Sequence, residues 1–232
     1  LVDERLMHDA LALALALVFY VLGSFAWGVL GWVAGILLLL WLWGSESEFK
    51  QMEELLALGR MGDQERLYAL AADSFQVPEG DNFFRRLQAR FLLRDAQVVF
   101  ASIFWLVLLG YWAAFFYLVN RAYRIHYQIE DEGLSSAVDA VLFYPVARLL
   151  VLGMALASDF QRVMQTVQGK LLTLDSQRLL ELAVAGALSH CDAKGGDEFS
   201  QQVDRLDTLH AILLRTLALW LVVAAVWVML LY

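Results

Sequence analysis

Hydrophobic residues occur along this chain in long uninterrupted blocks, and polar residues form separate blocks between them. The runs at residues 10–43, 96–120 and 212–232 contain almost every stretch that lacks charge. Apolar windows of about 18 residues or more are typical of helices that cross a bilayer, because hydrocarbon cannot solvate charged groups. A transmembrane β-barrel would instead need alternating apolar and polar positions. The pattern therefore predicts an all-α, polytopic integral membrane protein with about four to five membrane-embedded helices.

The first apolar run is too long for a single span. As one helix, residues 10–43 would measure roughly 51 Å at about 1.5 Å per residue, against a hydrocarbon core of about 30 Å. Gly23 and Gly28 lie near its middle, where a turn would divide it into two helices. The run is also too long for the apolar core of a cleaved signal peptide. We therefore expect residues 1–43 to form a retained membrane hairpin.

The polar blocks carry signals for helix starts. Ser45 and Glu48 form a capping-box pattern, and Asp63 stands before a second helical segment. Asp81 or Asn82 is expected to cap the helix that then enters the second apolar run. The predicted organisation is a membrane hairpin at 1–43, a cytoplasmic helical hairpin at 44–95, a central membrane segment at 96–160, cytoplasmic helices at 161–211 and a C-terminal transmembrane helix at 212–232.

Aspartates also mark the expected helix starts in the last third of the chain. Asp159 opens an amphipathic segment, and Asp175 is expected to cap a helix that ends near Ser189. Asp197 is expected to cap a long final helix that enters the membrane near Ile212. Residues 190–196 are expected to form a loop between these helices.

A fourth apolar run, at residues 137–158, is interrupted by two charges. Its length suits a span, but Asp139 and Arg148 are costly in hydrocarbon unless they are paired or hydrated, so they are candidates for function. They fall on roughly opposite sides of a helix with about 3.6 residues per turn, so they cannot pair directly. Pro145 between them favours a kink. The two open interpretations are a polar pocket at the kink, facing the cytoplasmic helices, and a snorkelling arginine with one structural ion pair.

The balance of charge predicts orientation. Lys and Arg are concentrated in the segments at 44–95 and 159–211, whereas the opposite side would hold only Arg121 and Arg124 outside the spans. The positive-inside rule therefore predicts that both segments of this multi-pass protein are cytoplasmic. If residues 137–158 do not cross, the second segment moves to the outside. The net charge of -8 argues against nucleic acid as a partner.

Four arginines precede the Phe-Trp span on one predicted helix: Arg85, Arg86, Arg90 and Arg94. Positive charges of this kind commonly anchor the cytoplasmic end of a span. Guanidinium groups donate paired hydrogen bonds, so several of them on one helix also suit a phosphorylated or other anionic ligand. Both interpretations stay open from the sequence.

Few other residues are candidates for catalysis, proton transfer or metal binding. His190, Cys191 and Asp192 are adjacent on a predicted loop and cannot converge on one ion without distant partners. His126 lies in a predicted interfacial aromatic cluster, with proton handling as the alternative. Cys191 is the only cysteine, and no nucleotide-binding loop or zinc-protease helix is present. The sequence therefore predicts no catalytic residues, no metal and no cofactor.

Residues 98–110, VVFASIFWLVLLG, resemble the FAxxFWxxLLG span of the AmpE family, membrane proteins linked to β-lactamase induction and cell-wall recycling in Gram-negative bacteria. Residues 116–121 resemble its continuation. Residues 139–160 resemble a Pro-Val-Arg-Leu helix that ends in Gly-Asp-Phe, although Pro145 stands one place early and Ser158 replaces the glycine. The likeness is most specific over residues 87–160.

The resemblance implies an inner-membrane regulatory or sensor protein that modulates cell-envelope stress signalling, such as β-lactamase induction in antibiotic resistance. Expected partners are the lipid bilayer, other membrane or cell-envelope proteins and an anionic small ligand. The candidate ligand-binding residues are Asp139, Arg148, Asn120, Arg90 and Arg94.

Two alternatives stay open. The chain also resembles the CobD/CbiB-type amide synthases of cobalamin biosynthesis, which share the Phe-Trp span. Those enzymes carry a Glu-Ser-x-x-Glu-Asn-x-x-Asp pattern ahead of it, and the matching positions here are Ala89, Arg90, Leu93, Arg94 and Gln97. A phosphate-handling site would need metal or amine ligands that these residues do not supply. The second alternative is a membrane scaffold subunit of a larger complex.

Overall fold

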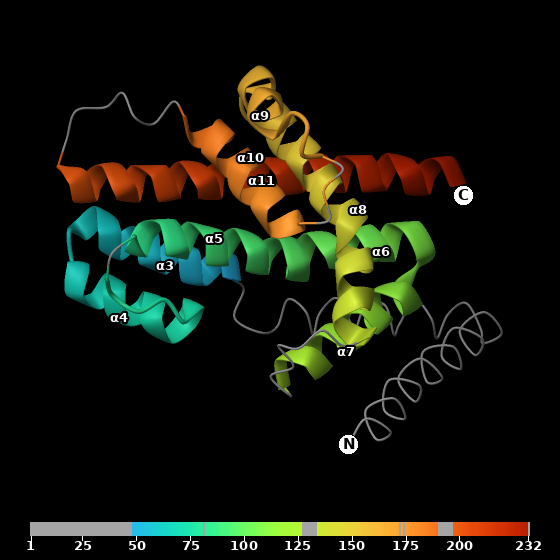
Figure 1. Cartoon of the computed structure of the whole chain (residues 1–232), viewed down its shortest axis with the longest axis horizontal. Helices are drawn as coiled ribbons and strands as arrows, with labels where there is room; N and C mark the ends of the chain where they lie inside the picture. Colours follow the sequence, from blue (N-terminus) through green and yellow to red (C-terminus); the bar gives the residue numbers. More distant parts are fainter. Residues whose placement is uncertain are drawn as a thin grey trace. The chain divides into compact units, whose positions relative to one another are not determined.

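The computed structural model describes residues 48–80, 82–126, 134–171, 173, 175–189 and 197–231. Every regular element in this part of the chain is helical, which confirms the predicted all-α class there (Figure 1). The predicted hairpin at residues 1–43 and the loop at residues 190–196 lie outside the described residues, as does the side chain of His126.

The chain divides into two compact units. The described residues of the first unit lie within Gln97–Val146, and those of the second lie within Glu46–Ala96 and Ala147–Tyr232. The second unit therefore combines the polar block that follows the N-terminal segment with the C-terminal third of the chain.

The second unit consists of helices that pack side by side. They are α3 (Glu48–Met61), α4 (Gln64–Phe75), α5 (Phe83–Asp95), the C-terminal part of α8 (Leu134–Ala157), α9 (Phe160–Val167), α10 (Ser176–Leu188) and α11 (Glu198–Leu231). Helix α11 contacts α3, α5 and α10, while α4 contacts both α3 and α5. The core of this unit is thus shared between segments far apart in sequence.

The predicted hairpin of α3 and α4 is present. Gly62 has a φ of 75°, in the left-handed region that favours glycine, and it follows the last residue of α3. The Asp63 side chain then accepts a hydrogen bond from the backbone N–H of Arg66 at 3.2 Å, which confirms the predicted cap of α4. Asn82, one of the two residues predicted to cap α5, occupies the cap position without a side-chain capping hydrogen bond, and Asp81 lies outside the described residues. The left-handed φ of Asn82, 61°, marks a turn instead.

Helix α5 continues through a π-helical segment, η1 (Ala96–Phe100), into α6 (Ala101–Leu109). The helix ends there because Gly110 has a φ of 86°, which other residues rarely adopt. Helix α7 (Tyr111–His126) follows and packs against α6 within the first unit. The sequence predicted one span over residues 96–120, so the break at Gly110 corrects that prediction.

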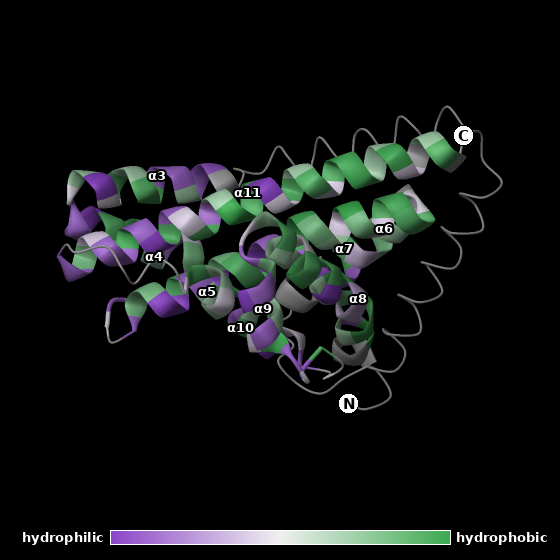
Figure 2. Cartoon of the chain, turned by 90° about the horizontal axis from the view of Figure 1, so that it is seen from above, coloured by the Kyte–Doolittle hydropathy of each residue, from purple (hydrophilic) through white to green (hydrophobic). Residues whose placement is uncertain are grey.

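Three helices in the described part are long and apolar enough to cross a membrane: Phe83–Leu109, Val138–Ala157 and Glu198–Trp227. The predicted total of four to five also counted residues 1–43, outside that part. In α8, Leu149, Leu152 and Leu156 expose 43%, 38% and 62% of their surface on one side, as a helix in contact with lipid does. Figure 2 shows α11 changing from mixed polar colours to hydrophobic green toward its C-terminus. The chain is therefore a helical membrane protein.

Close helix packing fixes the C-terminal helices in the second unit. A Cβ added at Gly153 of α8 would lie 2.7 Å from Thr216 Cγ2 of α11, so α8 and α11 approach closely there. A Cβ at Gly186 of α10 would lie 3.0 Å from the Cα of Val163 in α9. Glycine at both positions allows contacts that a larger residue would prevent.

The predicted helix starts in this region are confirmed. The side chains of Asp159 and Asp175 cap α9 and α10 by accepting from the backbone N–H groups of Arg162 and Arg178. Pro145 lies inside α8, which continues past it as one helix.

Candidate functional site

A row of arginines runs along one side of α5, because residues four apart share a helix face. Arg94 donates a hydrogen bond to the carbonyl oxygen of Ser74 at 2.6 Å, and its guanidinium lies 5.8 Å from the centre of the Phe75 ring. Arg86 donates to the carbonyl oxygen of Pro78 at 3.4 Å. Arg94 therefore binds the end of α4, and Arg86 binds the connection that follows it.

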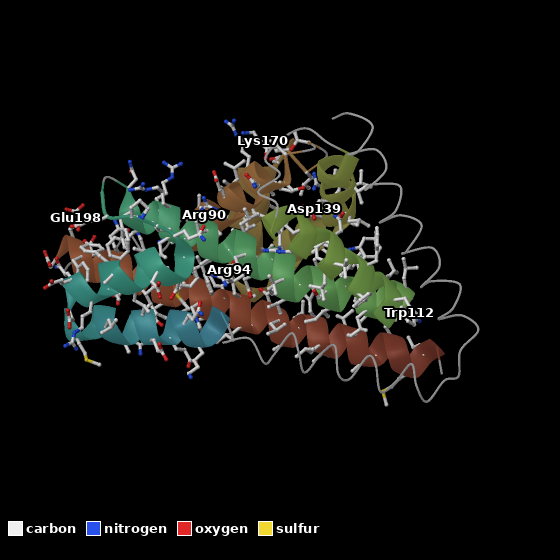
Figure 3. The ribbon with its side chains drawn as sticks, turned by 90° about the horizontal axis from the view of Figure 1, so that it is seen from below. Arg90, Arg94, Trp112, Asp139, Lys170 and Glu198 are labelled. Carbon is white, nitrogen blue, oxygen red and sulfur yellow. The ribbon has the colours of Figure 1, made fainter. Side chains whose placement is uncertain are left out.

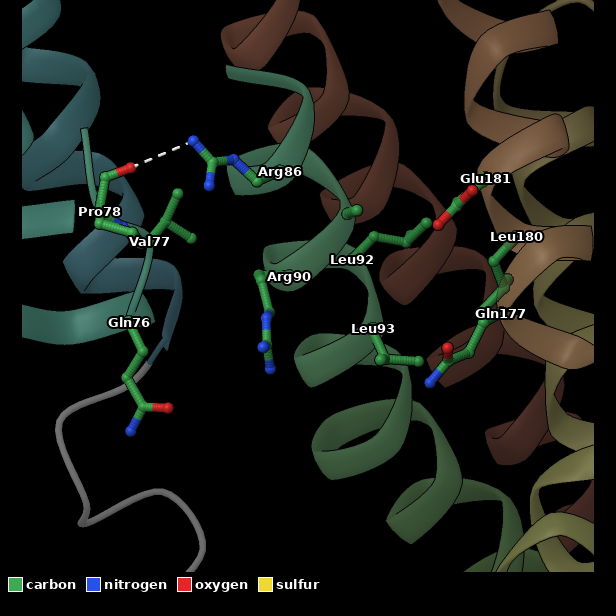
Figure 4. A pocket seen from close by; sticks show the side chains of 11 residues that line it. Gln76, Val77, Pro78, Arg86, Arg90, Leu92, Leu93, Gln177, Leu180 and Glu181 are labelled. Atoms are coloured by element: carbon green, nitrogen blue, oxygen red, sulfur yellow. Dashed lines mark hydrogen bonds between the residues drawn. The ribbon is translucent and has the colours of Figure 1, made fainter. Parts of the chain in front are cut away.

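Arg90 lies between them on the same row and differs from both. Its side chain is exposed, and the structure gives its guanidinium no hydrogen bond or ion pair within the described residues. Figure 3 shows Arg90 and Arg94 along α5, and Figure 4 shows Arg90 beside the bonded pair of Arg86 and Pro78. Of these arginines, Arg90 is thus the one whose charge is open to a ligand.

Arg90 lines a cleft of about 450 Å³ within the second unit (Figure 4). The walls come from α5, from α10 and from the connection after α4. The lining residues are Gln76, Val77, Pro78, Arg86, Ala89, Arg90, Leu92, Leu93, Gln177, Leu180 and Glu181. Two arginines and one carboxylate thus line the same cleft, together with amide and apolar side chains.

The two guanidinium groups of this cleft are suited to bind an anion. Guanidinium groups donate paired hydrogen bonds to carboxylate or phosphate but do not exchange protons near neutral pH. A cleft of this size falls within the range of about 300–1,000 Å³ that small-molecule sites occupy. In the part of the chain that the structure describes, no cluster of His, Cys, Asp and Glu could hold a metal ion.

Arg148, in the middle of α8, forms a second arrangement in the same unit. It donates to the carbonyl oxygen of Leu171 at 3.1 Å, to Ser176 Oγ at 2.7 Å and to the carbonyl oxygen of Thr173. Ser176 is buried and is the first residue of α10. One side chain from α8 thus binds two described residues of the connection between α9 and α10 and the first residue of α10; we call this set of contacts the Arg148 clamp.

The five predicted site residues fall in different places. Arg90, Arg94 and Arg148 belong to the second unit, where Arg90 lines the cleft and the other two bind backbone carbonyls. Asp139 and Asn120 belong to the first unit. Asp139 is 8% exposed on α8, and Asn120 is half-buried on α7.

Sequence reasoning missed the residues that complete the cleft. Gln177, Leu180 and Glu181 of α10 form one wall, and Gln76 lies at another. The one available signal was the spacing of Gln177 and Glu181, which share a face of the helix that Asp175 caps. Nothing in the order of residues pairs that face with α5.

Comparisons of the chain with family models, with curated proteins and with solved structures found no match. A functional assignment therefore depends on the geometry of the second unit and on the resemblance of residues 87–160.

Proposed function

We propose that this chain is a regulatory or sensor protein of the bacterial inner membrane that modulates cell-envelope stress signalling, such as β-lactamase induction, like the AmpE family that it resembles. The observation that carries the proposal is the Arg148 clamp. It ties the middle of a candidate membrane span to the start of α10, and α10 is a wall of the cleft that Arg90 lines.

This connection offers a physical route from a bound ligand to the membrane. A ligand changes a protein's conformation only when it binds one arrangement more tightly than another. An anion held between α5 and α10 favours one position of α10, and the clamp links that position to the middle of α8. Because coupling of this kind is reciprocal, a change at α8 alters the affinity of the cleft by the same factor.

The polar helices of the second unit are proposed to lie on the cytoplasmic side. The segments before and after the central spans belong to one compact unit, in which Arg60 of α3 forms a 2.8 Å ion pair with Asp207 of α11. They therefore share one side of the membrane, and the excess of Lys and Arg favours the cytoplasmic side.

Cysteine labelling tests this orientation. Gln64 on α4 and Gln161 on α9 are exposed, so a cysteine at either position would react if the reagent could reach it. A maleimide that cannot cross membranes should label both variants only after the inner membrane is permeabilised. Labelling of Gln161→Cys in intact spheroplasts would place the segment after α8 outside and contradict the orientation.

The signalling role is tested in a bacterium whose own copy of the gene is deleted. Deletion should lower the induction of β-lactamase by a β-lactam, and the wild-type chain should restore it. Arg148→Leu should fail to restore induction at equal abundance in the membrane, whereas Arg148→Lys should restore it in part, because an ammonium cannot supply the planar fork. Normal induction by Arg148→Leu at normal abundance would show that the charge only anchors the helix.

A further inference from the structure

We infer that the cleft between α5 and α10 binds the phosphate group of a phosphorylated amphiphile, with Arg90 as its anchor. The inference rests on the proposed function and names the ligand class of that site. Three features of the cleft carry it: its charge, its position along α5 and its apolar walls.

The positive charge of the cleft comes from two arginines that have different roles. Arg86 bonds to Pro78 and positions the rim, while the Arg90 guanidinium has no protein partner among the described residues. A free guanidinium offers two parallel N–H donors, which match the oxygens of a phosphate. The side-chain amides of Gln76 and Gln177 supply further donors around the same cleft.

The position of the cleft is set by the helix that carries Arg90. The apolar part of the span begins at Ala96, directly after Arg94 and Asp95. Arg90 stands roughly 9 Å before Ala96 along the axis, at about 1.5 Å per residue. Each headgroup layer of a bilayer is about 5–8 Å thick. A long arginine side chain can reach across the remaining distance, so Arg90 lies at the level of lipid phosphates.

The apolar walls distinguish this cleft from a site for a bare anion. Pro78, Ala89 and Leu93 line it beside the arginines with part of their apolar surface accessible, while Val77, Leu92 and Leu180 behind them are almost fully buried. Apolar surface of this kind is stabilised when a ligand replaces the water on it. A molecule that carries a phosphate at one end and hydrocarbon at the other satisfies both parts of the cleft, whereas inorganic phosphate satisfies one.

Among the residues that the structure describes, Glu181 is the one carboxylate that lines the cleft. A like charge disfavours an anion nearby, and the repulsion grows as water is excluded. Glu181 therefore weakens binding in the wild-type chain and keeps the affinity low enough for the ligand to leave. Its removal should tighten binding, an effect that a damaged fold would not produce.

The test uses the purified full chain in a neutral detergent. Dioctanoyl phosphatidic acid is titrated as the phospholipid, glycerol 3-phosphate as the soluble phosphate and dioctanoylglycerol as the phosphate-free lipid. We expect dioctanoyl phosphatidic acid to bind to the wild-type chain. Arg90→Gln should weaken its affinity by about tenfold or more. Glu181→Gln should tighten binding by roughly threefold or more. Arg66→Gln is the matched control, because Arg66 is an exposed arginine on α4 that does not line this cleft.

The outcomes separate the sources of the phosphate and the two proposals. Tight binding of glycerol 3-phosphate that depends on Arg90 would assign the phosphate to a soluble molecule. Equal binding of dioctanoylglycerol, or unchanged binding by Arg90→Gln, would overturn the inference. If Arg90→Gln loses binding while Arg148→Leu induces β-lactamase normally, the proposed function fails and the site stands. If Arg148→Leu abolishes induction while Arg90→Gln binds normally, the inference alone fails.

Discussion

Two arginines of the second unit have opposite surroundings. Arg148 in the middle of α8 donates to two backbone carbonyls and a buried hydroxyl. Arg90 on α5 is exposed and has no bonding partner in the described part of the chain. Both residues carry a positive charge on a helix that is long and apolar enough to cross a membrane. The comparison shows that the partners of a guanidinium, and not its charge alone, separate a structural arginine from one open to a ligand.

The difference has a physical consequence for each region. A buried hydroxyl and carbonyls that lose a charged donor must find water or stay unpaired, so removing Arg148 should loosen the connection between α9 and α10. Arg90 leaves no protein group unpaired when it is removed. The two regions should therefore respond differently to the loss of the same charge.

The largest expected effect comes from a change that disturbs both regions together. Gly186→Leu should place atoms against the backbone of α9, where a Cβ alone would lie 3.0 Å from Val163 Cα. We expect a loss of about 3 kcal/mol of stability from overpacking, with loss of both the clamp and the cleft wall. Thermal melting in detergent measures it. Ala185→Leu is the control, because Ala185 is exposed on the same helix and should cost less than about 0.5 kcal/mol. Equal melting of the two variants would contradict the packing.

A smaller and more local effect is expected at the clamp. Arg148→Leu should accelerate amide hydrogen exchange in the first turn of α10, by about tenfold or more, because opening of this turn no longer breaks charged hydrogen bonds. Exchange in α3 should stay unchanged, which makes α3 the internal reference. Unchanged exchange at Ser176 to Leu179 would mean that the clamp contributes nothing to the order of α10.

Two arginines on α5 should differ in their contribution to stability. Arg94→Gln removes a 2.6 Å hydrogen bond to Ser74 and the contact with the Phe75 ring, so it should cost about 1–2 kcal/mol. Arg90→Gln should change stability by less than about 0.5 kcal/mol. Thermal melting compares the two variants. Because both carry the same substitution on the same helix, a difference in stability is due to the bonding partners of Arg94. A larger loss of stability from Arg90→Gln than from Arg94→Gln would contradict this prediction.

The smallest effect is expected at the surface of the unit. Arg60 and Asp207 form an ion pair whose side chains remain 63% and 44% exposed. Solvent screens such pairs, so Arg60→Gln should cost about 0–1 kcal/mol, and added salt should reduce that cost further. Melting at low and high salt checks it. A salt-independent loss above about 2 kcal/mol would show that Arg60 does more than pair with Asp207.

The sequence predicted those features that local chemistry determines. Asp63, Asp159 and Asp175 start helices as expected, because a carboxylate that accepts from the helix N-terminus acts within one turn. The candidate spans over Val138–Ala157 and in α11 follow from hydrophobicity alone.

Other features depend on tertiary contacts or backbone geometry and could not be predicted. Membrane helices tolerate glycine, so Gly110 gave no sign that it would end α6. The acceptors of Arg148 include backbone carbonyls. Every residue possesses one, so the residue types in the sequence do not indicate which carbonyls accept from Arg148. The sequence proposed Arg90 and Arg94 together as ligand-binding residues. Only their neighbours in space give Arg94 a carbonyl to bind and leave Arg90 at the cleft.

The central claim is that the Arg148 clamp couples α8 to the cleft, and the most direct test is the affinity of the cleft when the clamp is removed. The dissociation constant of dioctanoyl phosphatidic acid is measured for the wild-type chain and for Arg148→Leu. Arg148 does not line the cleft, so a direct contact cannot account for a change. Reciprocal coupling predicts that Arg148→Leu weakens binding by about fivefold or more, and that Arg148→Lys falls between. Identical affinities in wild type and Arg148→Leu would contradict the account.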